Sequence, residues 1–225
     1  MSSSRSVAVV FDLDGTLVHS APDIAAAANV ALAVMGRDAL DLETVTSFVG
    51  NGVEKLMERC LFETGVCDPE LQERAIQTFL SAYAENPATL TRPFEGVAQA
   101  LARLDAAGVV MGVCTNKPQG PAQDICAALG MSGHLRVIAG AVPDVPKKPD
   151  PTPLLRTIVE MQVEPQNTVF VGDSGIDFQT ARAAGVAFRL YSGGYLNTDL
   201  PDLGALYRFD YWSMITPDWV RAAVA

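Results

Sequence analysis

Short runs of apolar, β-branched residues recur along the chain and alternate with alanine-rich stretches of helical periodicity. The runs are Val7–Phe11, Val109–Cys114, Arg136–Ala139, Thr168–Val171 and Val186–Leu190. The helical stretches cover residues 95–107, 118–129, 151–161 and 176–184. Runs that are apolar throughout are typical of strands covered on both faces. The alternation therefore predicts βαβ units and an α/β fold with a doubly wound, Rossmann-like parallel sheet.

One region interrupts this alternation. Between residues 18 and 91 the pattern predicts no strand, only helices near residues 22–36, 51–64 and 69–86. The passage Asn86–Pro93 is typical of a linker and closes the region. We expect residues 18–91 to form an inserted helical cap domain, and residues 1–17 and 92–225 to form a discontinuous α/β core. The alternative is one continuous helical layer.

Polar side chains collect directly after the predicted strands. They are Asp12 and Asp14 after the first run, Thr115 and Asn116 after the second, Asp173 and Asp177 after the fourth, and Lys148 ahead of the helix at 151. Taken singly, each acid could serve only in a turn or a helix cap. Parallel strands, however, bring their carboxyl ends to one edge of the sheet, where ligands bind. The convergence predicts one polar crevice.

Other polar residues are left out of this predicted crevice. Lys117 and Lys147 are interpreted as solvated surface lysines. His19 and His134 are interpreted as surface or packing residues, because two histidines so far apart in the chain suggest no metal spacing.

The charge of the chain and its cysteines indicate which binding partners and which cellular compartment to expect. The chain has 26 acidic against 16 basic residues, a net charge of −10, which disfavours nucleic acid and anionic membranes as partners. The 4 cysteines include no CxxC pair. No apolar run approaches a membrane span, and the five apolar residues after the N-terminal 1–6 are too few for a signal peptide. We expect a cytoplasmic protein, a monomer or a homodimer, with a small-molecule ligand.

The predicted crevice is strongly acidic. Asp12, Asp14, Asp173 and Asp177 around one lysine would carry a charge of about −3, which requires a cation. Few, hard oxygen ligands beside a phosphate-like anion favour Mg²⁺ over Zn²⁺. An EF-hand is excluded, because its required glycine would fall at Leu17.

These motifs resemble those of the haloacid dehalogenase superfamily of phosphohydrolases over nearly the whole chain. Four segments are similar to the four motifs of the superfamily, in order. They are Asp12–Thr16 (DLDGT), Thr115-Asn116, Lys148 and Gly172–Asp177. The helical insert resembles the family's type-1 cap.

The resemblance implies a phosphatase mechanism. Asp12 would attack phosphorus and form an aspartyl-phosphate, which splits hydrolysis into two easier steps. Asp14 would act as general acid/base, and two residues of extended chain let both acids face one phosphoryl group. Mg²⁺ would be held by Asp12, the main-chain carbonyl of Asp14, and Asp173.

The resemblance also implies roles for the remaining polar residues. Thr115 and Asn116 would donate hydrogen bonds to phosphoryl oxygens, and Lys148 would supply a fixed positive charge. Asp177 would orient Lys148 or a metal-bound water.

Within the superfamily, Ser20–Asp23, Phe48–Gly52 and Lys148–Pro153 resemble bacterial phosphoglycolate phosphatases. This implies hydrolysis of 2-phosphoglycolate to glycolate and phosphate. The backbone N–H groups of Gly50, Asn51 and Gly52, which open a predicted helix, could receive a small carboxylate. His19 stands where relatives carry aspartate, which raises a question about the hinge of the cap.

Other activities are weighed against this one. In dehalogenases the position of Asp14 is not an acid, so ester hydrolysis is favoured over dehalogenation. A phosphosugar mutase of the β-phosphoglucomutase type and a phosphatase for another small ester remain enzyme alternatives. A phospho-aspartate receiver domain is the non-enzyme alternative, although it would be about half this length and lack the insert.

Overall fold

The computed structural model describes residues 7–85, 88–196, 200 and 207–224, and its main sheet is parallel throughout. The strands are β1 (Ala8–Phe11), β4 (Val110–Pro118), β5 (Val137–Ala141), β6 (Thr168–Gly172), β7 (Ala187–Tyr191) and β8 (Arg208–Phe209). Their order is β5-β4-β1-β6-β7-β8. The chain moves outward from β1 through β4 to β5, then returns to the other side of β1. This reversal confirms the doubly wound sheet and places its switch point at β1.

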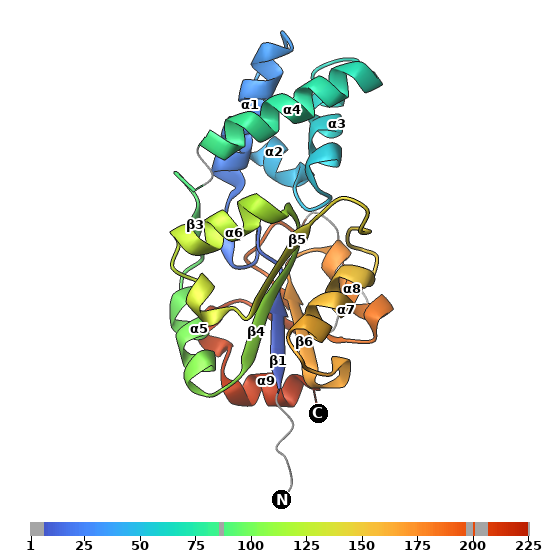
Figure 1. Cartoon of the computed structure of the whole chain (residues 1–225). Helices are drawn as coiled ribbons and strands as arrows, with labels where there is room; N and C mark the ends of the chain where they lie inside the picture. The colour runs from blue at the N-terminus through green and yellow to red at the C-terminus, as the bar shows by residue number, and fades with distance from the viewer. Residues whose placement is uncertain (1–6, 86–87, 197–199, 201–206, 225) are drawn as a thin grey trace, which may run out of the picture.

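Helices cover both faces of the sheet (Figure 1). One cluster joins the sheet to α5 (Val97–Ala106), α6 (Gln119–Ala128) and α9 (Pro217–Val224). The other joins it to α7 (Thr152–Glu160) and α8 (Gly175–Ala184). Short 3₁₀ turns lie at Ser132–His134, Pro165–Asn167 and Trp212–Met214. Alternate residues of β1 enter opposite clusters, which explains why this strand is apolar throughout.

Strand β4 is longer than the sequence predicts. It continues through Thr115, Asn116 and Lys117 to Pro118, with a register shift against β5 between Cys114 and Pro118. The three polar residues are buried at the strand end. The polar pattern ends the predicted strand at Cys114, whereas pairing with β5 carries the backbone further.

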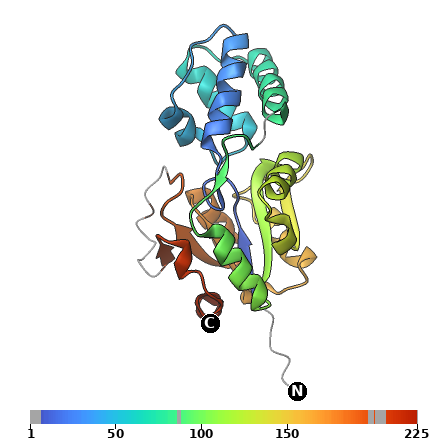
Figure 2. The ribbon, with the colours of Figure 1, turned by 90° about the vertical axis from the view of Figure 1, so that its left-hand side faces the viewer.

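The insert consists of α1 (Ala21–Val34), α2 (Leu42–Phe48), α3 (Val53–Glu63) and α4 (Pro69–Glu85), packed together beyond the carboxyl ends of the strands (Figures 1 and 2). Three of these helices match the predicted ones. The prediction missed α2, because 7 residues are too few to show helical periodicity. Asp41 caps it by accepting a hydrogen bond from Thr44 N.

The expectation of no strand between residues 18 and 91 was wrong at its edge. Val18–His19 (β2) pairs antiparallel with Arg92–Pro93 (β3), so the two ends of the insert lie side by side. Asp23 strengthens this junction by accepting hydrogen bonds from the main-chain N–H groups of Leu90 and Thr91. A two-residue strand carries no periodic signal. Figure 2 shows the junction as a narrow connection below the insert helices.

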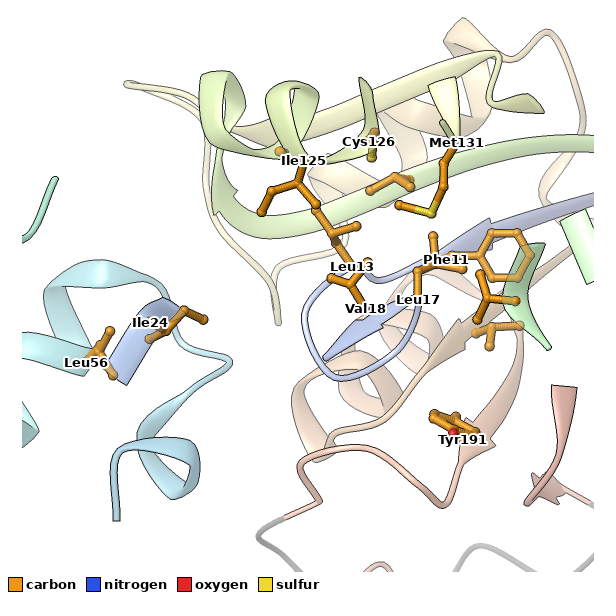
Figure 3. Close-up of a cluster of buried hydrophobic side chains, with 14 of the residues drawn as sticks. Phe11, Leu13, Leu17, Val18, Ile24, Leu56, Ile125, Cys126, Met131 and Tyr191 are labelled. Carbon is orange, nitrogen blue, oxygen red and sulfur yellow. The ribbon is translucent and has the colours of Figure 1, made fainter. Parts of the chain in front are cut away.

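The turn that follows β1 is held in place by apolar side chains that it buries in the core. Leu13 and Leu17 are fully buried near Phe11 and Val18 (Figure 3), and the N–H of Leu17 donates to the Leu13 carbonyl over 3.0 Å. Burying a leucine stabilises a fold by about 1.5–3 kcal/mol. The alternation of buried leucines with Asp12 and Asp14 therefore holds the acids on the other side of the turn.

Membrane insertion finds no support in the helices that the structure describes. None of them combines the length and the apolar composition that a membrane span needs. Residues 1–6, on which the expectation about a signal peptide rests, and residues 86–87 of the linker passage lie outside the described residues.

Candidate active site

The register of the sheet brings the predicted polar residues to one edge. Phe11 lies opposite both Val113 of β4 and Val171 of β6. Asp12 N–H donates to the Val171 carbonyl over 2.8 Å, which extends the ladder by one residue. The next positions along β4 and β6 lead to Thr115 and Asp173, so the turn and the two strand ends face one crevice.

Three carboxylates of this edge form a buried cluster. Single oxygens of Asp12, Asp173 and Asp177 all lie within 4.8 Å of one another. Lys148 Nζ lies 2.9 Å from Asp12 Oδ1 and 2.6 Å from Asp177 Oδ1. The structure thus brings together four of the residues that the sequence predicts for the site, from the carboxyl ends of β1 and β6, the first turn of α8 and the segment ahead of α7.

The cluster has more negative than positive charge. Three carboxylates against one ammonium leave a net charge of −2 if all are ionised. Burial raises the pKa of Asp12 to about 6, with Lys148 acting against the rise. Burial, and then the neighbouring Asp177 and Asp12, also raise the pKa of Asp173. Asp12 Oδ1 is buried and, beyond its ion pair with Lys148, has no well-angled hydrogen bond within the described residues. Such a set of hard oxygen atoms fits a small divalent cation.

Asp173 is held rigidly by elements on both sides. Thr16 Oγ1 donates to Asp173 Oδ1 over 2.7 Å, and Tyr195 N–H donates to Oδ2 over 2.7 Å. Gly194 lies so close that an added Cβ would stand 2.2 Å from Asp173 Cβ. A side chain there would push Asp173 out of the cluster.

Asp177 serves two structures at once. It closes a capping box at the start of α8 with Ser174, and its Oδ1 accepts from Lys148 Nζ. The second contact joins Asp177 to Lys148, and its orienting role stays a prediction.

Asp14 lies in a separate environment, and here the prediction for Lys117 was wrong. Ser20 Oγ donates to Asp14 Oδ1 over 2.5 Å, and Lys117 Nζ lies 3.1 Å from the same oxygen. Lys117 is only 7% exposed, and its ammonium lies 4.4 Å from the centroid of the Tyr83 ring. The local pattern around Lys117 gives no sign that α4 covers it, so the sequence could not show its burial.

The Asn116 side chain is already engaged. Its Nδ2 donates to the carbonyls of Lys148 over 2.9 Å and of Gly50 over 3.1 Å, while its Oδ1 accepts from Lys148 N–H. In this conformation the amide fixes the Lys148 backbone and joins β4 to the insert. A hydrogen bond from this amide to a phosphoryl oxygen requires the contact with Gly50 to open.

A cavity lies between the sheet edge and the insert. Asp12, Asp14, Thr115, Asn116 and Lys117 line it from the core, and the insert contributes Gly50, Gly52, Tyr83 and apolar side chains. Gly50 and Gly52, with φ of 118° and 86°, thus line the cavity, and their role in substrate binding stays a prediction. Asn51 is not among the described residues that line the cavity.

His19 and Tyr195 connect the junction of the insert to Asp173. His19 Nδ1 lies 2.9 Å from the Tyr195 hydroxyl, and that hydroxyl accepts from Ala21 N–H, the first residue of α1, over 3.0 Å. The Tyr195 backbone in turn binds Asp173. His19 is a packing residue, as expected, but Tyr195 escaped the sequence analysis. No motif links a tyrosine 22 residues after Asp173 to that carboxylate.

The remaining residues set aside by the sequence analysis are peripheral. Lys147 pairs with Glu54 of α3 at an exposed position, and His134 pairs with Asp105. Burial raises the pKa of Cys114, beside the cluster, to about 12, so its thiol stays protonated near neutral pH and is a poor nucleophile.

Comparison with known proteins gives a consistent result. Residues 9–190 match the model of the family described as haloacid dehalogenase-like hydrolase. A phosphoglycolate phosphatase of Cereibacter sphaeroides is 39% identical over 96% of this chain and 99% of its own. One of Rhodospirillum rubrum is 37% identical over 95% and 90%. The crystal structure of a predicted phosphoglycolate phosphatase from Haemophilus somnus aligns with a TM-score of 0.84 at 28% identity, covering 95% of this chain and 97% of the other.

Proposed function

The chain belongs to the family of haloacid dehalogenase-like hydrolases, and we propose that it is a Mg²⁺-dependent phosphomonoester hydrolase acting on 2-phosphoglycolate. The observation that carries the proposal is the division of labour between Asp12 and Asp14. They border one cavity, yet Asp12 joins the Lys148 cluster while Asp14 pairs with Ser20 and Lys117.

Asp12 is the nucleophile in this proposal. Its carboxylate forms a bond to phosphorus as the bond from phosphorus to the ester oxygen breaks, and Asp14 gives a proton to the departing alkoxide. Water then attacks the aspartyl-phosphate, loses a proton to Asp14, and releases inorganic phosphate and free Asp12. In this proposal Lys148 provides fixed positive charge beside the nucleophile, and Thr115, which lines the cavity, donates to a phosphoryl oxygen.

The acid cluster supplies the metal site in this proposal. Asp12, the main-chain carbonyl of Asp14, and Asp173 would hold Mg²⁺. When bound, the ion neutralises the charge that otherwise separates an anionic nucleophile from an anionic phosphoryl group. Thr16 and the Tyr195 backbone hold Asp173 by hydrogen bonds to its two carboxylate oxygens.

We further propose that residues 18–91 act as a cap domain. The support is that α1–α4 pack on one another and join the rest of the chain through the paired ends β2 and β3 (Figure 2). The Asn116–Gly50 and Lys147–Glu54 contacts hold the insert against the sheet edge. Closure of this kind excludes water and selects the substrate.

The names of the curated relatives support 2-phosphoglycolate over other phosphate esters. The free cysteines of the described residues support a reducing, cytoplasmic location. A monomer or a homodimer is compatible with both proposals.

A panel of phosphate esters tests the function. The protein is assayed with 2-phosphoglycolate, a hexose phosphate and an aryl phosphate, each in the presence of Mg²⁺ and of EDTA. We expect 2-phosphoglycolate to give the highest kcat/KM and EDTA to abolish turnover. Faster isomerisation of the hexose phosphate, with no oxygen from labelled water in phosphate, would overturn the proposal in favour of a mutase.

A further inference from the structure

The insert side of the cavity is apolar except at one place. Its wall contains aliphatic and aromatic side chains, namely Ile24, Val49, Val53, Leu56, Phe79 and Leu80. Tyr83 of α4 is the exception, and it faces Lys117 of β4 with the ammonium 4.4 Å from its ring centroid. Among the described residues that line the cavity, Lys117 is the one cation.

The buried Tyr83 hydroxyl is not satisfied by a well-formed hydrogen bond. Tyr83 is 3% exposed, and its hydroxyl oxygen makes no well-angled hydrogen bond within the described residues, with the Lys117 ammonium its near neighbour. A buried polar group left unpaired destabilises the fold, so such groups usually have a use. Burial raises the pKa of Tyr83, with Lys117 acting against the rise, so the phenol keeps its proton and can donate it.

Lys117 can also bind a second anion besides Asp14. An ammonium has three N–H donors. Lys117 Nζ lies 3.1 and 3.2 Å from the two carboxylate oxygens of Asp14, and both accept from it. The nearby cations of the insert border are occupied elsewhere. Lys55 pairs with Glu58, Lys147 pairs with Glu54, and Arg59 donates to the Phe48 carbonyl.

The position of Lys117 beside Asp14 identifies which part of a substrate it meets. Asp14 protonates the ester oxygen in the proposed function, so a group that touches Asp14 lies beside the leaving alcohol. In 2-phosphoglycolate a single carbon separates that oxygen from the carboxylate. A receptor for this carboxylate must therefore adjoin the general acid, as Lys117 does.

We propose that the Lys117 ammonium and the Tyr83 hydroxyl form the receptor for a carboxylate on the leaving group of the substrate. The proposal rests on the proposed function and adds to it the residues that select the substrate. One donor comes from the core and the other from the insert, so the carboxylate binds both halves together. A receptor at Lys117 and Tyr83 is an alternative to the backbone N–H groups of Gly50, Asn51 and Gly52 that the sequence analysis considers.

Two esters of equal length separate this role from a general one. 2-Phosphoglycolate carries the carboxylate, and 2-hydroxyethyl phosphate replaces it with a neutral hydroxymethyl group. Steady-state kcat/KM is measured for both esters in the wild type, Tyr83→Phe and Lys117→Met, with Lys55→Met, whose exposed lysine pairs within α3, as the control for loss of a lysine of the insert. Thermal unfolding of each variant verifies that it folds.

We expect Tyr83→Phe to lower kcat/KM for 2-phosphoglycolate about tenfold and Lys117→Met about a hundredfold, as for lost hydrogen bonds to a charged group. The loss for 2-hydroxyethyl phosphate is expected to be at least about tenfold smaller than for 2-phosphoglycolate in Lys117→Met, and within about twofold of the wild type in Tyr83→Phe. Lys55→Met is expected to keep the preference of the wild type. Because Tyr83→Phe removes one oxygen atom only, it keeps the test decisive if Lys117→Met does not fold.

Equal losses for the two esters would overturn the receptor, since they would place Lys117 and Tyr83 at the phosphoryl group or at Asp14 alone. The proposed function would survive that result. If the wild type instead hydrolyses a different carboxylate-bearing ester and ignores 2-phosphoglycolate, the proposed substrate fails, and the same variants test the receptor on the active ester. A wild type without preference for any carboxylate-bearing ester would overturn the receptor.

Discussion

Lys148 and Lys117 are both buried and both pair with an aspartate of the DLDGT turn, but their surroundings differ in origin. Lys148 contacts Asp12 and Asp177 and lies over the Phe170 ring at 5.3 Å, all in the α/β core. Lys117 contacts Asp14 of the core and Tyr83 of the insert. The first region is complete without the insert, whereas the second exists only when the insert lies on the sheet edge. We interpret the first as the site of bond making and the second as the site of selection.

The largest expected effect comes from the nucleophile. Asp12→Asn keeps the shape of the side chain but removes the attacking charge, so turnover should fall by about a thousandfold or more on every ester. The measurement is the steady-state rate on an aryl phosphate and on 2-phosphoglycolate. Asp38→Asn, at an exposed position of the insert, is the matched control. Substantial residual activity in Asp12→Asn would remove Asp12 from its role.

Lys148→Met should lower the free energy of unfolding more than Lys117→Met does, which would distinguish the two regions. It leaves three buried carboxylates without their ammonium, and breaking a buried ion pair by removing one member costs about 3–5 kcal/mol. Lys117→Met should cost less, because Asp14 keeps Ser20 as a partner and its side chain is 12% exposed. Urea denaturation in EDTA measures both free energies of unfolding. An equal or larger loss in Lys117→Met would contradict the distinction between the regions.

The metal-free protein should grow more stable as the pH falls from about 7 toward 4. The folded-state pKa of Asp12 is raised from 3.8 to about 6, so between these values the folded protein binds more protons than the unfolded chain. Stability therefore decreases as the pH rises through that window, by up to about 3 kcal/mol for a shift of this size.

Mg²⁺ should remove much of this penalty, since a ligand at about 100 times its Kd stabilises the folded state by about 2.7 kcal/mol. Thermal unfolding at several pH values, with EDTA or Mg²⁺, measures both effects. A metal-free protein whose stability is flat across the window would argue against an acid cluster with raised pKa values.

The smallest expected effect lies at the junction between the regions. Tyr195→Phe removes the hydroxyl that binds His19 and Ala21 but keeps the backbone N–H that binds Asp173. The free energy of unfolding should fall by about 1–2 kcal/mol, as for two part-buried hydrogen bonds, and the concentration of Mg²⁺ for half-maximal activity should not change. Tyr211→Phe, where the tyrosine is 70% exposed, is the control. A shifted Mg²⁺ requirement would show that the hydroxyl also positions Asp173.

Much of the core and of the phosphoryl-binding region could be predicted before any tertiary contact was known. Apolar runs of strand length, spaced by helices, indicate a parallel sheet, and a parallel sheet brings its strand ends to one edge. Asp12, Asp173 and Lys148 follow from that rule, because each lies directly beside a predicted element. Their convergence is a consequence of topology, which the periodic pattern reports.

The second region could not be predicted in this way. Lys117 carries the same local signal as any lysine near a strand end. Its burial depends on Tyr83 and Asp14, which lie 34 and 103 residues away in the chain. The same holds for the Asn116 amide, which binds Gly50 across the cavity, and for Tyr195, which reaches both Asp173 and the start of α1.

The sequence by itself determined the fold class, the four motifs and the acid pair that points to phosphoryl chemistry, because periodicity and order along the chain suffice for them. Only the tertiary structure decided which lysine is withdrawn from water and which carbonyl an amide binds. The physical reason is that desolvation of a charge is set by whichever distant element covers it. By its local sequence Lys117 looks like a surface residue. The insert helices cover it at the edge of the sheet, so that it becomes the cation among the described residues lining the cavity.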